Sequence, residues 1–171
     1  PTPKFFVYET FQEIIESQQQ LNLEFKKGAF IKPCKEGSSI DIIKIKDFSK
    51  IDLEEIKLNL VDKDRKFLVE RFIEGREFTV GFLNDQILEP LEIITEREFY
   101  DFSAKYDDEE TKIIKADLRQ EDLQTLKEIA KDSFNILGMK KWGRVDILQD
   151  KKGDFFILEL NTVPGMTDHS L

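Results

Sequence analysis

The spacing of apolar residues changes along the chain, and each spacing predicts one type of secondary structure. An apolar residue every three to four positions predicts helices, which we place at residues 11–25, 52–63 and 119–138. Short apolar runs, several of them alternating with polar residues, predict strands at residues 29–33, 40–45, 67–73, 76–83, 86–94, 142–149 and 154–161. Strands outnumber helices and several follow one another through short turns, so we predict an α+β fold with largely antiparallel sheets.

Individual residues mark where these elements begin and end. Asp52 stands at the start of the second helix and predicts its N-cap. Gly138 lies just past the third helix, in the position where a glycine commonly ends one. Residues 97–118 form a long connection of mixed composition without clear periodicity, and connections of that kind are often functional.

The composition narrows the class of protein. Of the 171 residues, 40% are hydrophobic and 15 are phenylalanine, which is enough for a core in one domain or two small ones. The net charge of −9 argues against duplex nucleic acid as a partner, because such a partner needs a basic surface. It leaves room for a small basic site that binds phosphate.

Cysteine usage and the apolar runs predict a location. Cys34 is the only cysteine, so no intrachain disulfide can form, and a single thiol fits a reducing cytosol. No apolar run approaches the roughly 18 to 20 residues of a membrane span, and the first residues lack the features of a signal peptide. We expect a cytoplasmic protein without a membrane partner. The chain has no initiator Met and ends abruptly at Leu171, so we expect both ends to be cut from a longer protein.

The last two predicted strands form a hairpin over the turn at residues 150–153. A tight turn gives three pairs, namely Gln149 with Asp154, Asp146 with Ile157, and Arg144 with Glu159. Cross-strand partners share a face and the face repeats every two residues. One face then carries Arg144, Asp146, Glu159 and Asn161, and the other carries Val145, Ile147, Phe156, Leu158 and Leu160 against the core.

The polar face of this hairpin has the donors of a metal site. Two carboxylates and an amide offer hard oxygen ligands, which suit Mg²⁺ held together with substrate phosphates. Two carboxylates so close would otherwise repel and shift each other's pKa. The alternative is a solvent-exposed strand face with an ion pair between Arg144 and Glu159, since opposite charges across strands are common.

Two other stretches suggest contacts to a nucleotide. In KPCKEGSS, Gly37 permits an open backbone, the serines offer donors to phosphate oxygens, and Lys32 supplies a point charge. In FLVERFIEGREFTV, Glu70 and Glu77 lie at strand ends, where a carboxylate can accept ribose hydroxyls. The alternatives are an ordinary hairpin turn and exposed acidic residues at strand ends.

Four segments, taken in order, resemble the ATP-grasp D-alanine–D-alanine ligases: KPCKEGSS, LVERFIEGREFTV, AKY, and GRVDIL followed by LELNTVPGMTDHSL. The resemblance covers nearly the whole chain, and NTVPGMTDHSL is its most specific part. It corresponds to the central and C-terminal ATP-grasp regions. We therefore expect the family's N-terminal domain, which helps hold the first D-alanine, and its final helical segment to be absent from this chain.

The resemblance implies a fold and an activity. The fold is ATP-grasp, with two subdomains whose largely antiparallel sheets enclose a nucleotide site. Residues 1–72 would form the small subdomain with a Gly-Ser lid loop, and residues 73–171 the C-terminal subdomain with the metal hairpin and a truncated substrate loop. The activity is ATP-dependent joining of two D-alanines to D-alanyl-D-alanine through an acyl phosphate, for peptidoglycan precursors. The full-length protein would be a homodimer, and this chain alone an inactive fragment.

The resemblance also implies roles for individual residues, with ATP and two Mg²⁺ as cofactors and Mn²⁺ as a substitute. The nucleotide contacts would be Lys32 and Lys105 at the phosphates, Glu36, Ser38 and Ser39 in the lid loop, Glu70 at the adenine, the hinge backbone of Arg71, Phe72 and Ile73, and Glu77 at the ribose. The metal ligands would be Asp146, Glu159 and Asn161. The catalytic set would be Arg144 and the backbone of Gly165 at the oxyanion, with Lys105, Tyr106 and Ser170.

Substrate specificity would come from residues near the C-terminus and in the long connection. Ser170 and Leu171 would hold the carboxylate of the second D-alanine. Tyr106 favours the dipeptide, because a His usually occupies that neighbourhood in the related D-alanyl-D-lactate ligases. His169, the only histidine, is given no catalytic role.

The chain departs from the family pattern in two places. Asp41 stands where the family usually has Gly, which adds negative charge near the phosphates, and KIIKADL replaces a proline-containing sequence. Three alternatives stay open: another ATP-grasp ligase, a nucleotide-binding module without activity, and a structural interaction domain that binds no Mg²⁺-dependent ligand.

Overall fold

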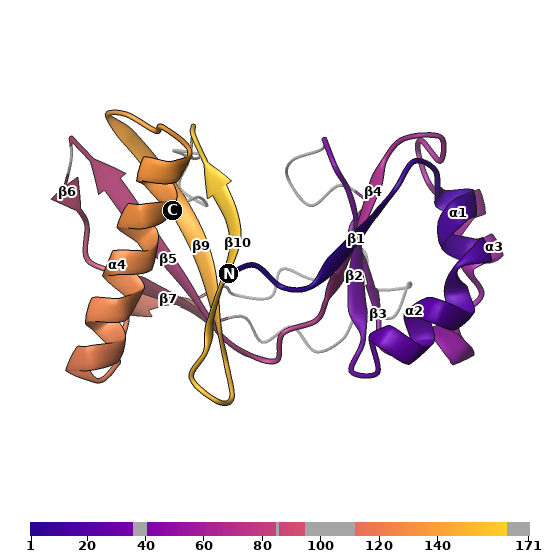
Figure 1. Ribbon diagram of the computed structural model, residues 1–171, viewed down its shortest axis with the longest axis horizontal. Coiled ribbons are helices and arrows are strands. Elements are labelled where there is room, and N and C mark those ends of the chain that lie inside the picture. The colour runs from indigo at the N-terminus through magenta and orange to yellow at the C-terminus, as the bar shows by residue number, and fades with distance from the viewer. Residues whose placement is uncertain (36–40, 85, 95–111, 164–171) are drawn as a thin grey trace. The chain divides into compact units, whose positions relative to one another are not determined.

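The computed structural model describes residues 1–35, 41–84, 86–94 and 112–163. The chain divides into two compact units (Figure 1). Among the described residues, the N-terminal unit comprises residues 3–35 and 41–72, and the C-terminal unit comprises residues 1–2, 73–84, 86–94 and 112–163. Each sheet in the described residues is antiparallel throughout, which confirms the predicted α+β class.

The N-terminal unit is a four-stranded sheet with helices on one face (Figure 1). Its sheet has the order β1-β4-β2-β3. In chain order its elements are β1 (Phe5–Tyr8), α1 (Phe11–Glu16), α2 (Gln18–Glu24), β2 (Ala29–Pro33), β3 (Ile43–Ile45), the 3₁₀ turn η1 (Phe48–Lys50), α3 (Leu53–Leu58) and β4 (Phe67–Arg71). The predicted hairpin of residues 29–33 and 40–45 is thus present as β2 and β3, with a shorter second strand.

The core of this unit lies between the sheet and the helices. The sheet contributes Ala29, Ile31, Ile45, Phe67 and Val69, and the helical layer contributes Phe11, Ile14, Leu21, Phe48, Leu53 and Ile56. Alternation along a strand sends the intervening residues to the opposite face. That face carries Phe30, Lys32, Leu68 and Glu70, and it matters for the candidate site.

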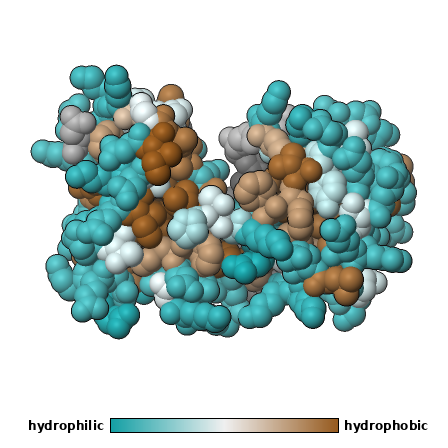
Figure 2. All heavy atoms as spheres, in the orientation of Figure 1, coloured by the Kyte–Doolittle hydropathy of each residue, from teal (hydrophilic) through white to brown (hydrophobic). Residues whose placement is uncertain are grey.

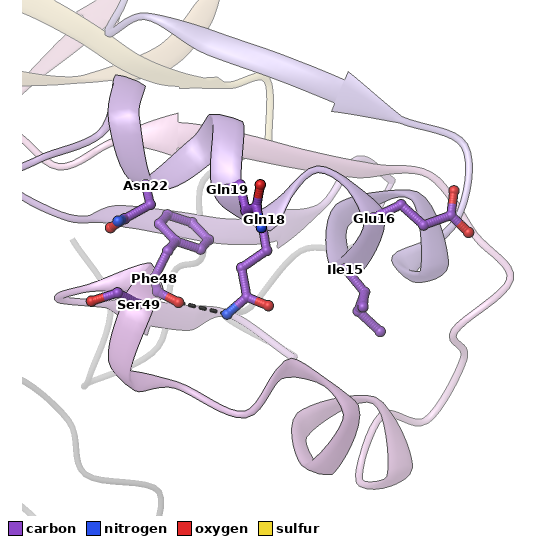
Figure 3. A pocket seen from close by; sticks show the side chains of 7 residues that line it. All are labelled: Ile15, Glu16, Gln18, Gln19, Asn22, Phe48 and Ser49. Carbon is purple, nitrogen blue, oxygen red and sulfur yellow. Dashed lines mark hydrogen bonds between the residues drawn. The ribbon is translucent and has the colours of Figure 1, made fainter.

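The predicted helix over residues 11–25 is interrupted at Ser17, which was not foreseen. The backbone of Ser17 has φ −92° and ψ 2°, and it ends α1 and precedes α2. The Gln18 side chain donates to the carbonyl oxygens of Phe48 at 2.5 Å and Ile51 at 3.1 Å, and the first of these bonds is drawn in Figure 3. These long-range bonds tie the start of α2 to η1, and local apolar spacing carries no information about them.

The predicted N-cap of the helix after Asp52 is confirmed. The Asp52 carboxylate accepts hydrogen bonds from the amides of Glu54 at 3.0 Å and Glu55 at 3.1 Å. The helix itself ends at Leu58, earlier than the pattern over residues 52–63 suggested. An N-cap carboxylate satisfies amides that have no partner within the helix.

Asp52→Ala is expected to lower the free energy of unfolding by about 1 kcal/mol, the usual cost of losing such a cap. Urea unfolding followed by circular dichroism measures the change. Asp132→Ala is a matched control, because Asp132 lies inside α4 on the exposed surface and caps no helix. A loss of stability in the control that equals the loss in Asp52→Ala would contradict the capping role.

The C-terminal unit is a six-stranded sheet with one long helix on one face (Figure 1). Its sheet has the order β10-β9-β5-β7-β8, and β6 pairs with β5. Its elements are β5 (Gly75–Leu83), β6 (Gln86–Ile87), β7 (Leu91–Ile94), β8 (Lys112–Lys115), α4 (Gln120–Ile136), β9 (Trp142–Asp150) and β10 (Phe155–Asn161). Its core is formed by Phe78, Val80, Phe82, Ala116, Leu126, Ala130, Phe134, Val145, Ile147 and Phe155.

Two features of this unit bear on the sequence predictions. Residues 112–115 of the long connection form β8, which mixed composition did not reveal. Gly138 follows α4 with φ 63°, a left-handed conformation that glycine adopts without strain.

One face of the molecule shows how hydrophilic and hydrophobic side chains are distributed on it. On the face shown in Figure 2, hydrophilic side chains cover most of each unit, with smaller patches of hydrophobic ones. Within the described residues, no helix is both long enough and apolar enough to span a membrane.

Candidate functional site

The hairpin of β9 and β10 has a different register from the predicted one. Near the turn, Phe155 faces Gln149 and Ile157 faces Ile147. The register then shifts, and beyond the shift Glu159 faces Asp146 and Asn161 faces Arg144. All three predicted pairs, Gln149 with Asp154, Asp146 with Ile157 and Arg144 with Glu159, are therefore wrong.

The difference has two physical causes. The turn includes Asp154, whose carbonyl oxygen accepts the amide of Asp150 at 2.9 Å and whose amide donates to the Asp150 carboxylate at 3.0 Å. A β-bulge at Leu158 then places one extra residue in β10. The predicted core positions Phe156 and Leu158 are therefore wrong. Phe155 and Ile157 contact the core instead, together with the correctly predicted Val145, Ile147 and Leu160.

The four predicted polar residues nevertheless come together. The Asp146 carboxylate accepts from Arg144 Nη2 at 3.0 Å and from Asn161 Nδ2 at 3.1 Å, both at Oδ2. The same Asn161 nitrogen donates to Glu159 Oε1 at 3.0 Å. Arg144 Nε lies 3.0 Å from Asp146 Oδ1 but is not aligned for a hydrogen bond. Arg144 is thus paired with Asp146, where the alternative interpretation expected Glu159.

A buried threonine that the sequence interpretation did not include completes this cluster. Thr79 lies on β5 directly opposite Asp146, is 3% exposed, and donates its hydroxyl to Asp146 Oδ1 at 2.7 Å. A sequence signal was available, because Thr79 follows Glu77 by two residues and so shares its face of the strand. The sequence did not indicate that β5 pairs with β9, and this pairing is what places Thr79 opposite Asp146.

The environment of Asp146 disfavours its charge. The side chain is only 4% exposed as a residue, and burial raises the pKa of the Asp146 carboxyl, with a further rise from the nearby Glu159. The hydrogen bonds from Thr79 and Arg144 act in the opposite direction but do not outweigh burial. A nearby cation would favour the charged form.

Asp146→Asn is expected to increase stability at neutral pH in the presence of EDTA. Because the pKa of Asp146 is raised in the folded state, the native state binds this proton at a higher pH than the unfolded state does. The native carboxylate therefore lowers stability above the raised pKa. That loss disappears as the pH falls below the ordinary pKa of an Asp, about 3.9. Asn at this position keeps an oxygen acceptor for Thr79 and never ionises.

Urea unfolding at a series of pH values tests this expectation. The stability difference between Asp146→Asn and the wild type should shrink as the pH falls and vanish below about 3.9. Glu128→Gln, on the exposed surface in the middle of α4, is the control for charge removal. A difference that does not change with pH would contradict the raised pKa.

The donor set of the hairpin fits Mg²⁺. Asn161 Nδ2 donates to the carboxylates of both Asp146 and Glu159. A cation bound there would likewise reduce the repulsion between these two negative charges. Rotation of the Asn161 side-chain amide by about 180° would place its oxygen where the nitrogen now lies, so that the oxygen could bind the cation. The described residues include no group of three or more His, Cys, Asp or Glu side chains arranged to hold a metal. Mg²⁺ is commonly bound by one or two carboxylates together with substrate phosphates, so this donor set is sufficient only with such a ligand.

Glu77 lies on the same face of the C-terminal unit as Thr79, two residues along β5. It faces Leu148 on β9 and Ile93 on β7, and Leu148 in turn faces Phe156 on β10. These three apolar side chains are half-buried. A row of apolar side chains with one carboxylate therefore runs next to the row of Glu159, Asp146 and Thr79.

In the N-terminal unit, the two predicted nucleotide contacts Lys32 and Glu70 pair with each other. Lys32 Nζ lies 2.9 Å from Glu70 Oε2, and Glu70 is 5% exposed. The ring of Phe30 lies beside this pair, with Lys32 Nζ 5.4 Å from its centroid. The face of the sheet without helices thus combines a buried ion pair with aromatic surface.

The predicted hinge residues are partly engaged within the N-terminal unit. The amide of Arg71 donates to Lys4 O at 2.8 Å, and the amide of Phe72 donates to Gly28 O at 3.1 Å. A ligand would therefore contact other backbone groups of this segment, such as its carbonyl oxygens. Ile73 is 7% exposed.

Asp41, the departure from the family pattern, has a structural partner. Its φ of 54° lies in the left-handed region that favours glycine. Its carboxylate pairs with the guanidinium of Arg65, and the side chains are 15% and 13% exposed. The negative charge added by Asp41 is therefore neutralised within the unit.

Several predicted site residues lie outside the described residues, and their roles stay predictions. They are Glu36, Ser38, Ser39, Lys105, Tyr106, Gly165, Ser170 and Leu171. A cavity between α1, α2 and η1, shown in Figure 3, contains none of the predicted site residues.

Comparisons with known proteins show the family to which this chain is similar. The family described as "D-ala D-ala ligase C-terminus" matches residues 2–171. A D-alanine--D-alanine ligase of Marinobacter nauticus is 46% identical over 142 residues, which cover 82% of this chain and 43% of the relative. A D-alanine--D-alanine ligase of Alcanivorax borkumensis is 37% identical over 172 aligned positions, which cover 100% of this chain and 52% of the relative.

Solved structures give the same result for the fold. The D-alanine--D-alanine ligase from Bacillus anthracis has a TM-score of 0.77 at 29% identity, over 99% of this chain and 54% of that one. The VanG D-Ala:D-Ser ligase from Enterococcus faecalis has a TM-score of 0.80 at 27% identity, over 99% of this chain and 50% of that one. The predicted ATP-grasp fold is thereby confirmed. The chain spans about half the length of the relatives it matches.

Proposed function

The chain belongs to the family of the D-ala D-ala ligase C-terminus, and on that premise we propose that the whole protein joins two D-alanines in an ATP-dependent reaction. The curated relatives are D-alanine--D-alanine ligases. The observation that carries the proposal furthest is the cluster of Asp146, Glu159 and Asn161 on the terminal hairpin.

ATP and Mg²⁺ are the proposed cofactors. A structure of the Bacillus anthracis ligase is a complex with ATP. Asp146, Glu159 and Asn161 would hold Mg²⁺ together with phosphate oxygens, and two ions would require phosphates or water for most of their ligands. The bound Mg²⁺ would supply positive charge against the phosphates, which lowers the barrier to phosphoryl transfer.

Contacts to the rest of the nucleotide are proposed for both units. Glu77 and the half-buried Leu148 and Phe156 offer a carboxylate for ribose hydroxyls and an apolar surface for a base. In the N-terminal unit, the Lys32 ammonium would contact a phosphate while it stays paired with Glu70, since it has three donor hydrogens. Glu70 would accept a hydrogen bond from the base. The pairing of Lys32 with Glu70 keeps both side chains ordered before the ligand arrives.

Arg144 is proposed to stabilise the oxyanion that forms when the amine of the second D-alanine attacks the acyl phosphate of the first. A guanidinium has five donor hydrogens, and its pairing with Asp146 uses only one edge of the group. Losing one such donor typically costs about 2.7–4 kcal/mol of transition-state stabilisation. Asp146 therefore both contributes a ligand to the metal and orients the arginine.

The remaining roles are proposed on the resemblance alone. Lys105 would contact phosphate, Tyr106 would favour the dipeptide, and Gly165, Ser170 and Leu171 would contact the substrate. A homodimer, a cytoplasmic location and a place in peptidoglycan precursor synthesis belong to the same proposal.

An assay of phosphate release by the full-length protein tests the proposed function. Release that requires ATP, Mg²⁺ and D-alanine together, with D-alanyl-D-alanine as the product, is the expected result. Release that depends on a different amino acid would point to another ATP-grasp ligase. Binding of ATP without any amino-acid-dependent turnover would leave only a nucleotide-binding module.

A further inference from the structure

Thr79 stands out among the buried polar residues because its hydroxyl is directed at a predicted metal ligand. Its neighbours on β5, Phe78 and Val80, are fully buried in the core of the C-terminal unit. Thr79 points to the opposite face, and there it is still only 3% exposed. A valine would have nearly the same shape, so the hydroxyl is the chemical feature that this position adds.

The hydroxyl of Thr79 fixes one side of the Asp146 carboxylate. It donates to Oδ1 at 2.7 Å from β5, a short bond to a charged acceptor and therefore a strong one. The other oxygen, Oδ2, accepts from Arg144 Nη2 at 3.0 Å on the same strand and from Asn161 Nδ2 at 3.1 Å on β10. Bonds from two neighbouring strands thus hold the carboxylate in one orientation, with Oδ2 on the side of Asn161 and Glu159.

We propose that Thr79 is a positioning residue for the metal site: its hydroxyl orients Asp146 so that Oδ2 is presented to a divalent cation together with Glu159. The inference rests on the proposed function, since it assigns Asp146 and Glu159 to metal binding. Residues that orient metal ligands through hydrogen bonds typically change metal affinity about 10–100-fold when they are replaced. Thr79 does not itself contact the metal in this role.

Paired substitutions separate this role from simple strand packing. Thr79→Val removes the hydroxyl and keeps the shape, whereas Thr79→Ser keeps the hydroxyl and removes a methyl group. Mn²⁺ affinity of the full-length protein, measured by electron paramagnetic resonance with ATP present, is expected to fall about 10–100-fold in Thr79→Val. Thr79→Ser should bind Mn²⁺ nearly as the wild type does. A role in packing alone would give the reverse order, because serine packs less well.

The steady-state kinetics give a second readout. The Mg²⁺ concentration for half-maximal turnover should rise in Thr79→Val, while turnover at saturating Mg²⁺ changes much less. If Thr79→Val does not fold, Thr79→Ala compared with Thr79→Ser gives the same contrast with a smaller side chain. Near-ultraviolet circular dichroism checks that each variant is folded.

The outcomes distinguish the inference from the function on which it rests. Wild-type protein that binds Mn²⁺ but loses nothing in Thr79→Val overturns the positioning role and leaves the proposed function intact. Wild-type protein that binds no Mn²⁺ in the presence of ATP overturns the proposed metal site, and the positioning role with it.

Discussion

Glu159→Gln is expected to abolish Mg²⁺-dependent turnover in the full-length protein while leaving the fold intact. Glu159 faces Asp146 across the hairpin and shares the Asn161 side chain with it. Removing its charge takes away one of two carboxylates that a cation needs beside the phosphates. Metal ions supply several kcal/mol of transition-state stabilisation, so turnover should fall by about 10³-fold or more.

The cost to the fold of Glu159→Gln should be small. Glu159 is exposed, and exposed substitutions usually change the free energy of unfolding by no more than about 0.5 kcal/mol. Turnover, Mn²⁺ affinity and urea unfolding should be measured on the same preparations. Glu128→Gln removes an exposed carboxylate from the middle of α4, keeps the oxygen that accepts from Gln124, and should leave all three quantities unchanged. Full turnover in Glu159→Gln would refute the assignment of the hairpin as the metal site.

Lys32→Met is expected to destabilise the N-terminal unit by about 3 kcal/mol, because it leaves the buried Glu70 carboxylate without its partner. The Lys32 side chain is 21% exposed and that of Glu70 is 6% exposed, so water can replace the lost ammonium only in part. Urea unfolding measures the loss. Lys4→Met is the matched control, since Lys4 pairs with Glu24 at 52% and 36% exposure. Such a surface pair contributes about 0–1 kcal/mol.

The double variant Lys32→Met with Glu70→Leu separates stability from binding. Replacing both members of a buried pair by apolar residues is often neutral or stabilising, so most of the lost stability should return. Binding of ATP should not return, because the cation and carboxylate proposed to contact it are gone. A double variant that recovers stability and also binds ATP like the wild type would refute both contacts. One that stays as unstable as Lys32→Met would mean that Lys32 stabilises the unit in another way.

The sequence predicted the candidate metal cluster better than the pairing that assembles it. Alternation placed Asp146 and Arg144 on one face of β9, which the hydrogen bonds confirm. The register of β10 was wrong, because Phe155 to Leu158 are all apolar and alternation cannot tell which of them face the core. The position of the bulge depends on the turn and on core packing, and the local pattern of apolar and polar residues predicts neither.

Contacts between segments far apart in the chain also could not be predicted from the sequence pattern. Thr79 lies 67 residues from Asp146 along the chain, and only the pairing of β5 with β9 brings them together. The break at Ser17 depends on bonds from Gln18 to Phe48 and Ile51, which lie 30 and 33 positions away along the chain. Local signals were reliable where a single residue decides the outcome, as with the N-cap Asp52 and with Gly138.

The bulge at Leu158 also affects how the protein behaves in concentrated solution. Among the strands of the described residues, β10 is the outermost on its side of the sheet. A regular outer strand is a template on which another chain can add a strand and start aggregation. Here the register breaks between Ile157 and Glu159, and the amide of Ile157 donates to Pro1 O at 2.9 Å. The irregularity that brings two carboxylates together therefore also protects this edge against intermolecular strand pairing.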